Sequence, residues 1–263
     1  MQTISINILL FFYNLKMFIK GKYTKVTYDP GLELYIATEG NMKRYFKDRY
    51  RGLRQFRRGM QREKNQLFAA YCLEEVNFEP NDIVIDCGAN YGNLFLSLSE
   101  KISEENYITF EPGPHEYFCL THSIPSAKHN NQALADISGA RTFYLKSKTG
   151  DSSLVEPPDY VETVTVECTT LDDVFEKEGI NSVKLLKLEA EGYEPEILQG
   201  AKNSLRKIKF VAIDGGPERG LKEEETFTTL TNMLIQAGFV LVKVNHRNQY
   251  RAIFRNNSEG TSR

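Results

Sequence analysis

An acid and two glycines follow a short apolar run in the segment Val84 to Gly92, which reads VIDCGANYG. The apolar run predicts a buried strand, and ligands of open α/β sheets bind beyond the carboxyl ends of such strands. We expect Gly88 to let the backbone approach a ligand closely and Gly92 to let the next helix start close to it. The turn lacks the G-x-G-x-x-G of dinucleotide folds and the G-K-[ST] of a P-loop, and it has no basic residue for a pyrophosphate. Asp86 therefore indicates a ligand with a cationic group.

A second acid, Glu111, ends the next expected strand, 25 positions after Asp86. An acid at this point of a βαβ unit commonly accepts hydrogen bonds from the two hydroxyls of a ribose, because a carboxylate offers two acceptor oxygens. S-adenosylmethionine carries a sulfonium, an ammonium and a ribose. The two acids and the glycines together predict a site for this cofactor, although either acid alone would equally fit a helix cap or a surface charge.

An acid-rich turn follows a third apolar run. The run, Val183 to Leu188, is expected to be a buried strand, and Glu189 and Glu191 come after it. Because parallel strands bring their carboxyl ends to one edge, both acids are expected beside Asp86 and Glu111. Methyl transfer to a hydroxyl requires an aligned acceptor, and a positioned base that takes its proton adds about 10²–10⁴-fold. Glu189 and Glu191 are therefore candidate catalytic bases.

The candidate bases have simpler alternatives. Glu191 could instead cap the following helix or pair with Lys187. His115, after the second strand, is a third candidate base, and its alternative is a polar surface residue. Acids at this edge could bind Mg²⁺ together with Asp214, but the chain has no EF-hand spacing and no histidine cluster, so we expect no metal site. The turn from Asp214 to Gly220 is expected to shape the acceptor pocket or its lid.

Alternating strands and helices must position these residues. From residue 66 onward the pattern predicts a mostly parallel sheet with helices on both faces. A separate pair of alternating segments, 140–145 and 161–167, is expected to be antiparallel. The expected strands are 83–86, 107–110, 183–188, 210–213, 239–244 and 250–254, and the expected helices are 66–76, 93–101, 171–178, 195–208 and 223–237.

The first 65 residues have a different pattern. A turn at 29–31 between two short apolar segments, 25–28 and 33–37, predicts a hairpin. Met42 to Lys64 then carries ten bases and two acids, a local charge of +8. This basic segment is expected to be a solvated helix face, and the alternative is a contact with an anionic partner such as an acidic sugar, a phospholipid head group or nucleic acid. Aromatic residues that would anchor it to the core are Tyr45, Phe46, Tyr50 and Phe56.

Before the hairpin, an apolar segment predicts an N-terminal helix. Ile8, Phe12, Leu15 and Ile19 recur at helical spacing, so this face is expected to pack on the protein itself or on a second copy in a homodimer. A peripheral contact with a membrane surface is the alternative. The uninterrupted apolar core, Ile8 to Tyr13, is far shorter than the ~20 residues of a membrane-spanning helix, and no secretory signal is recognisable.

Four blocks of the sequence together resemble the FkbM-type methyltransferases, over about Gln66 to Phe254. The resemblance implies a Rossmann-like seven-stranded methyltransferase sheet. It implies that Asp86, Gly88, Asn90 and Gly92 line S-adenosylmethionine, that Glu111 holds its ribose, and that the acceptor is a hydroxyl of a sugar, a glycan or a natural product. The family usually has Asp where this chain has Glu189, so the carboxylate lies about one bond length further out. The blocks are IDCGANYGN, TFEPGP, LKLEAEGYEPEILQGA and VAIDGGPERG, with NQALADISGARTFYL as a weaker fifth.

The composition is that of an ordinary globular protein, with 41% hydrophobic and 26% charged residues and a net charge of −2. This charge, and the absence of an N-P-P-Y or D-P-P-Y turn, argue against a nucleic-acid methyltransferase. An inactive methyltransferase-fold interaction module is the other alternative. Four scattered cysteines favour reduced thiols in the cytoplasm. We expect an N-terminal extension at 1–65, a methyltransferase domain at 66–255 and a frayed tail at 256–263.

Overall fold

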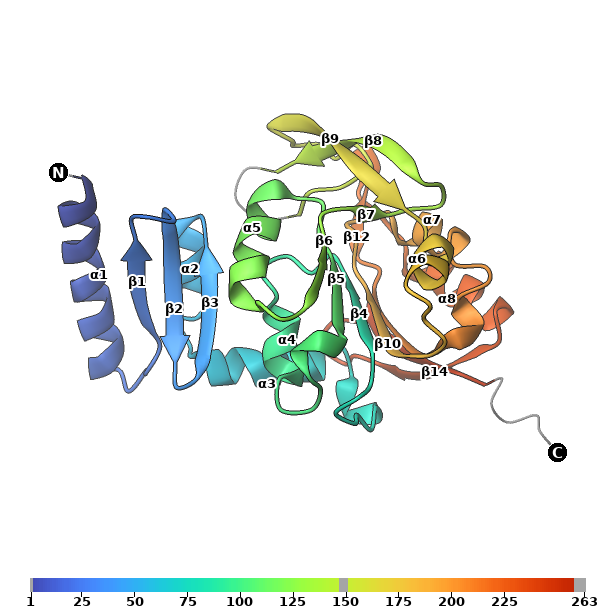
Figure 1. Ribbon diagram of the computed structural model, residues 1–263, viewed down its shortest axis with the longest axis horizontal. Helices are drawn as coiled ribbons and strands as arrows, with labels where there is room; N and C mark the ends of the chain where they lie inside the picture. The colour runs from blue at the N-terminus through green and yellow to red at the C-terminus, as the bar shows by residue number, and fades with distance from the viewer. Residues whose placement is uncertain (1, 147–150, 258–263) are drawn as a thin grey trace.

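A computed structural model of the chain describes residues 2–146 and 151–257 (Figure 1). Its centre is a seven-stranded sheet in the order β14–β15–β11–β10–β4–β5–β6. All neighbours from β11 to β6 are parallel, whereas β15 is antiparallel to both β11 and β14. This is the expected Rossmann-like methyltransferase sheet. The strands are β4 (Val84–Cys87), β5 (Tyr107–Phe110), β6 (Lys128–Asn130), β10 (Val183–Leu188), β11 (Ile208–Asp214), β14 (Phe239–Val244) and β15 (Arg251–Asn256).

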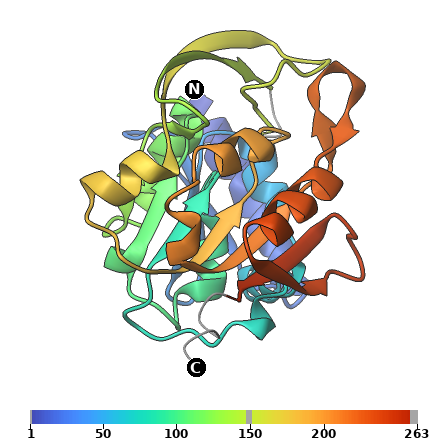
Figure 2. The same cartoon turned by 90° about the vertical axis from the view of Figure 1, so that its right-hand side faces the viewer.

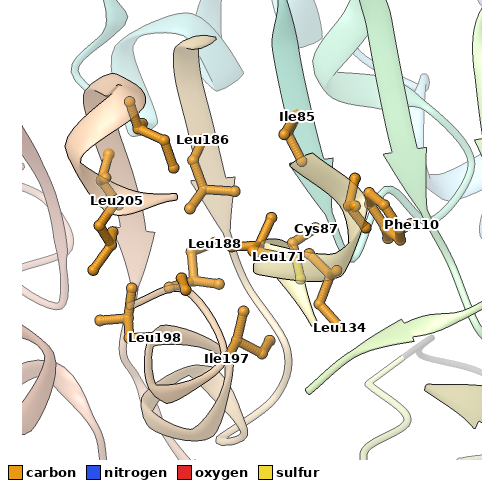
Figure 3. Close-up of a cluster of buried hydrophobic side chains, with 14 of the residues drawn as sticks. Ile85, Cys87, Phe110, Leu134, Leu171, Leu186, Leu188, Ile197, Leu198 and Leu205 are labelled. Atoms are coloured by element: carbon orange, nitrogen blue, oxygen red, sulfur yellow. The ribbon is translucent and has the colours of Figure 1, made fainter. Parts of the chain in front are cut away.

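Helices cover both faces of this sheet, as expected. Adjacent residues of a strand point to opposite faces, so Val84 packs into one apolar cluster and Ile85 into the other. Figure 2 looks onto α6, α7 and α8 with the central strands behind them. Figure 3 shows the core on that side, where Leu186 and Leu188 of β10 meet side chains of α6 and α7. The helices are α3 (Met60–Ala70), α4 (Asn93–Leu98) and α5 (Pro114–Ser123) on one face, and α6 (Leu171–Lys177), α7 (Glu194–Gln199) and α8 (Phe227–Gln236) on the other.

The helix expected at 93–101 ends at Leu98, and three other expected helices differ more from the structure. The helix expected at 66–76 starts earlier, as α3, and a left-handed residue, Cys72, separates it from a 3₁₀ turn at Leu73–Glu75. The helix expected at 195–208 stops at Gln199 and resumes as a 3₁₀ turn at Leu205–Lys207. The start of the one expected at 223–237 is taken up by a small hairpin. Two further 3₁₀ turns lie at Glu104–Asn106 and Gly220–Lys222, and the hairpin consists of β12 (Pro217–Arg219) and β13 (Glu224–Glu225).

A smaller three-stranded sheet lies above the carboxyl ends of β4 and β5 in Figure 1. Its long antiparallel pair confirms the pair expected from sequence, and a short strand runs parallel to one of its members. Its position places it over the edge where the predicted site residues follow their strands. The strands are β7 (Ala133–Leu134), β8 (Gly139–Leu145) and β9 (Glu162–Thr169), in the order β7–β9–β8.

The N-terminal part forms its own antiparallel sheet, β1–β2–β3. The predicted hairpin is confirmed, but the basic segment is not a helix face throughout, because it begins as a third strand. Phe46 of that strand is fully buried, and Arg44 is buried with its guanidinium donating to the carbonyl oxygens of Lys43 and Ser123. Of the interleaved aromatics only Tyr50 is exposed. The elements are β1 (Lys25–Asp29), β2 (Leu34–Glu39), β3 (Met42–Phe46) and α2 (Arg49–Gln55).

This three-stranded sheet contacts the rest of the molecule through α5 and the turn after β4. The backbone amide of Tyr45 donates to Ser123 Oγ at 3.1 Å, and the ring of Phe46 lies 5.2 Å from that of Tyr91. Helix α3 runs through residue 65, where a domain boundary is expected from sequence. The division of the chain into domains stays a prediction.

Helix α1 (Gln2–Ile19) packs on the outer edge of this sheet with a face other than the expected one. The side chain of Asn14 pairs with both backbone polar groups of Val26 in β1 at 2.8 Å, as a neighbouring strand would. In this orientation of the helix, the side chains of Leu10 and Met17 are buried. The expected face, Ile8, Phe12, Leu15 and Ile19, is exposed instead. Within residues 2–146 and 151–257, no helix combines the length and apolar character needed to cross a membrane.

Candidate functional site

A cavity of about 310 Å³ lies at the carboxyl ends of β4, β5 and β10, near the lower end of the range for small-molecule sites. Its wall includes the turn after β4, the acid-rich turn after β10, the small upper sheet, and helices α2 and α3. Two predicted site residues, Gly92 and His115, are not part of its wall. The predicted residues that line it are Asp86, Gly88, Asn90, Glu111, Glu189 and Glu191.

The two glycines are required by contacts within the protein. Gly88 has a φ of +70°, and a Cβ there would lie 2.1 Å from the carbonyl oxygen of Glu189. Gly92 has a φ of +78°, and its Cβ would lie 2.6 Å from the Ile124 side chain after α5. Only glycine tolerates both the left-handed backbone and such approaches. The close neighbours of these glycines within the protein are therefore the acid-rich turn and the end of α5, and their approach to a ligand stays a prediction.

Glu111 joins two loops at the rim of the cavity. One carboxylate oxygen accepts the backbone N–H of Asn90 at 2.7 Å and the other accepts that of Gly113 at 2.8 Å. Burial, together with the nearby Glu116, raises the pKa of Glu111 to about 7. Each oxygen keeps a further lone pair, so the carboxylate can still receive two neighbouring hydroxyls.

The turn after β4 also holds two unsatisfied acceptors. Among the described residues, neither the Oδ1 atom of Asn90 nor that of Asn93 has a hydrogen-bond partner, although both are buried. Both asparagines line the cavity. Buried polar atoms nearly always find partners, so these oxygens are suited to donors of a ligand.

The carboxylate of Asp86 is directed at protein groups. It accepts a hydrogen bond from the Tyr107 hydroxyl, and Lys187 Nζ lies 3.2 Å away. That ammonium also donates to the carbonyl oxygens of Cys87 at 3.0 Å and Gly88 at 2.7 Å. Thus the cation beside Asp86 is Lys187, which fixes the turn. A direct contact between Asp86 and a ligand stays a prediction.

Glu189 is held as an anion by three side chains. The Tyr71 hydroxyl donates to Oε2 at 2.5 Å, Lys187 Nζ lies 2.9 Å from the same oxygen, and Arg251 Nη2 lies 3.4 Å from Oε1. Burial disfavours the charge, but the Lys187 ammonium and the Arg251 guanidinium outweigh it and lower the pKa of Glu189 to about 2. A carboxylate this acidic and this well bonded is a weak base.

The surroundings of Glu191 disfavour its charged form, in contrast to those of Glu189. Burial, reinforced by the carboxylates of Glu218 and Glu189, raises its pKa far above that of an ordinary glutamate. The pKa of the neighbouring acid Glu218 is also raised, first by burial and then by nearby acids. The negative charges of the two side chains disfavour each other, so the pair retains a proton at neutral pH.

Other residues fill the two alternative roles of Glu191, which were to cap the following helix and to pair with Lys187. Glu194 Oε1 accepts the N–H groups of Ala190 at 2.7 Å and Gly192 at 3.1 Å, so it caps the turn into α7. Lys187 pairs with Asp86 and Glu189. The sequence did not reveal Glu194 as the cap, because three glutamates occur within six residues.

The remaining sequence candidates lie away from the cavity or have other partners. His115 is exposed on the first turn of α5. Asp214 Oδ2 accepts from Arg251 Nε at 2.5 Å. In the part of the chain that the structure describes, no group of three or more His, Cys, Asp or Glu side chains is placed to hold a metal ion. Arg219 of the expected lid turn binds Glu196 and the Gly192 carbonyl, and so anchors α7.

Tyr71 and Arg251 are the site residues that sequence reasoning missed. Tyr71 lies at the end of α3, 118 positions before Glu189 in the sequence. Arg251 lies on β15, well after Glu189. A weak signal existed, since Lys187 is a charged residue between two leucines of a largely apolar segment and a buried charge requires partners.

Comparisons with known proteins show which family the chain is similar to. A family model described as the methyltransferase FkbM domain matches residues 86–241. The hexuronic acid methyltransferase AglP of Haloferax volcanii is 26% identical over 151 residues, which cover 54% of this chain and 58% of AglP. The 2-O-methyltransferase NoeI of Sinorhizobium fredii is 24% identical over 181 residues, which cover 60% of this chain and 73% of NoeI. The chain thus spans less than two thirds of the length of AglP.

Solved structures are similar to this chain only at low identity. The magnesium protoporphyrin IX methyltransferase of Synechocystis PCC 6803 has a TM-score of 0.42 and 12% identity, over 77% of this chain and 81% of that one. The family model covers more than half of the chain and includes the turn after β4, Glu111 and the acid-rich turn. This protein therefore belongs to the FkbM family of methyltransferases.

Proposed function

We propose that this chain is an S-adenosylmethionine-dependent methyltransferase that acts on a hydroxyl group of a sugar, a glycan or a natural product. The observation that carries the proposal is Glu111, whose carboxylate lies at the cavity rim with a free lone pair on each oxygen. Similarity to the hexuronic acid methyltransferase AglP, the 2-O-methyltransferase NoeI and the 31-O-demethyl-FK506 methyltransferase of Streptomyces tacrolimicus supports a hydroxylated acceptor.

The residues around the cavity fit the cofactor. Glu111 would accept the two ribose hydroxyls, and the free oxygens of Asn90 and Asn93 would accept N–H donors, such as those of an ammonium. When bound, S-adenosylmethionine supplies a methyl group on a sulfonium for in-line attack by an acceptor oxygen. Lys187 keeps the turn after β4 in place by holding the carbonyl oxygens of Cys87 and Gly88.

The two predicted acids have different tasks in this proposal. Glu189 stays ionised and keeps Lys187, Tyr71 and Arg251 in position. Glu191 faces the cavity, and the pair that it forms with Glu218 holds one proton and keeps one ionised carboxylate, which takes the proton of the acceptor hydroxyl. A base is most effective when its pKa is close to the working pH, and the raised pKa of the pair brings it toward that range. His115, exposed on α5, has no part in this mechanism.

Calorimetric titration tests the cofactor site. We expect wild-type protein to bind S-adenosylmethionine and S-adenosylhomocysteine at micromolar concentration. Glu111→Gln should bind at least about 10-fold more weakly, because an amide loses the charge of the acceptor. Glu33→Gln, at an exposed glutamate paired with Lys47 far from the cavity, is the matched control. A folded wild-type protein that binds neither compound would contradict the proposal.

Transfer of a labelled methyl group tests the acceptor class. Candidate acceptors are simple hexoses and hexuronates, offered with labelled cofactor, and the product is analysed for an O-methyl ether. Glu191→Gln should lose turnover while keeping cofactor affinity, since it removes the proton acceptor but little volume. Methylation of a nitrogen or of nucleic acid would refute the proposed acceptor.

A further inference from the structure

The N-terminal extension reaches the cavity through helix α2. Arg51 and Gln55, one helical turn apart, both line the cavity wall. They lie outside residues 86–241, the part of the chain that the family model matches. Of the ten bases in the basic segment, Arg51 is the one on this wall.

Arg51 is held firmly at the turn after β4. Its backbone N–H donates to Asp48 Oδ1 at 2.9 Å, which caps the start of α2. A Cβ at Gly52 would lie 3.1 Å from the Phe46 ring, so the helix lies close against β3. The Arg51 guanidinium is 4.7 Å from the centre of the Tyr91 ring, and Tyr91 directly follows Asn90. The guanidinium is therefore fixed by stacking.

The charges around the cavity leave Arg51 without an anionic partner. Three bases line the wall. Lys187 pairs with Asp86 and Glu189, and Arg251 pairs with Asp214 and Glu189. For Arg51 the described residues supply no ion pair, and its Nη1 atom is buried without a hydrogen-bond partner. A buried guanidinium N–H that lacks an acceptor is costly, so the site is suited to an anion.

We propose that Arg51 binds a carboxylate of the ligand in this cavity, an inference that rests on the proposed function. The planar guanidinium can donate two parallel N–H groups to a carboxylate. Because Glu111, Glu116, Glu189 and Glu191 share the same wall, a singly charged carboxylate is favoured over a doubly charged phosphate. Two ligands could supply it: the amino-acid part of the cofactor or a hexuronate acceptor.

The first experiment tests the cofactor as the source. Wild-type protein, Arg51→Met and Arg51→Lys are titrated with S-adenosylhomocysteine and with 5′-methylthioadenosine, which lacks the amino-acid carboxylate. If the carboxylate is the cofactor's, Arg51→Met weakens S-adenosylhomocysteine binding about 10- to 100-fold and leaves 5′-methylthioadenosine unchanged. Arg51→Lys recovers part of the loss. Arg54→Met, on the exposed side of the same helix, is the control.

The second experiment tests the acceptor as the source. Protein saturated with S-adenosylhomocysteine is titrated with glucuronate and with glucose. If the carboxylate is the acceptor's, Arg51→Met keeps its affinity for S-adenosylhomocysteine but loses the preference for glucuronate over glucose. Circular dichroism confirms that each variant is folded.

The outcomes separate this inference from the proposed function. If wild-type protein binds S-adenosylhomocysteine and Arg51→Met matches it for S-adenosylhomocysteine and for glucuronate, the role of Arg51 is refuted and the cofactor site stands. If wild-type protein binds neither probe, both proposals are refuted.

Discussion

Replacing Gly88 with alanine should strongly destabilise the protein, for two reasons that can be measured separately. The φ of +70° places the residue in the left-handed region, and the new Cβ would lie 2.1 Å from the Glu189 carbonyl oxygen. An ordinary contact at this position begins near 3.4 Å. The acid-rich turn would therefore have to move by about 1 Å, which close-packed interiors resist.

The expected cost follows from these two terms. A left-handed alanine costs about 1–2 kcal/mol, and forcing an extra carbon into a filled space costs about 1–3 kcal/mol. Gly88→Ala should therefore lower the free energy of unfolding by about 2–5 kcal/mol. For a chain of this size each kcal/mol lowers Tm by about 2–4 °C.

Substitutions at two other glycines measure separately the cost of the left-handed backbone and the cost of the steric contact. Gly179 has a φ of +63° and nothing within 4 Å of a Cβ, so Gly179→Ala measures the backbone term. Gly200 has a φ of −81°, and its Cβ would lie 2.1 Å from the Ala135 carbonyl oxygen, so Gly200→Ala measures the contact term. All three substitutions restrict the unfolded chain equally, and this effect cancels in the comparison.

Urea unfolding followed by circular dichroism gives the three free energies. We expect the loss for Gly88→Ala to be close to the sum of the losses for the two controls. Its affinity for S-adenosylhomocysteine should also fall, because Lys187 bonds the Gly88 carbonyl. If Gly88→Ala is no less stable than Gly179→Ala, the close approach of the two turns carries no cost and our reasoning about this glycine is wrong.

Four further predictions concern ionisation, a buried hydrogen bond and the N-terminal helix. Because the pKa of Glu111 is raised from 4.5 to about 7, the folded protein keeps a proton that the unfolded chain releases; the free energy of unfolding should therefore fall between about pH 4.5 and 7 by about 3 kcal/mol more than in Glu111→Gln, and equal slopes in urea titrations would contradict this. Tyr107→Phe should lower the free energy of unfolding by about 1.5–3 kcal/mol, since the buried carboxylate of Asp86 loses its hydroxyl donor; an unchanged urea midpoint would contradict this. Glu191→Gln should raise the free energy of unfolding at pH 8 by at least about 1 kcal/mol, because it relieves a crowded group of acids; a loss of stability would contradict this. Phe12→Ser on the exposed face of α1 should abolish either dimerisation in sedimentation velocity or binding to anionic vesicles; wild-type protein that shows neither association would remove both expected partners.

The central strands could be predicted because their residues face apolar clusters on both sides. Val84 and Ile85 belong to different clusters, so β4 appears in the sequence as an unbroken apolar run. By contrast, β6 has the sequence Lys-His-Asn and lies at the sheet edge. It is stabilised by backbone pairing with β5, which leaves no signal in side-chain hydrophobicity.

The site could be predicted where its residues follow strands and not where distant parts of the chain meet. Glu111, Glu189 and Glu191 were found from their positions after β5 and β10. The side chains that set the charge of Glu189 could not be found in this way. Tyr71 and Arg251 lie on α3's end and β15, and spacing along one sequence does not show which of its many Tyr and Arg side chains meet an acid.

The position of Arg251 has a consequence for the order in which the molecule is completed. It lies on β15, which follows the other six strands of the central sheet in the sequence and inserts between β11 and β14. Until β15 has left the ribosome, β11 has an open edge, and the carboxylates of Glu189 and Asp214 lack the cation that they share. The nascent chain must therefore delay both the closure of its sheet and the neutralisation of these acids until β15 has been made. A chain terminated before β15 would keep an open strand edge, a form prone to aggregation, and would lack the finished site.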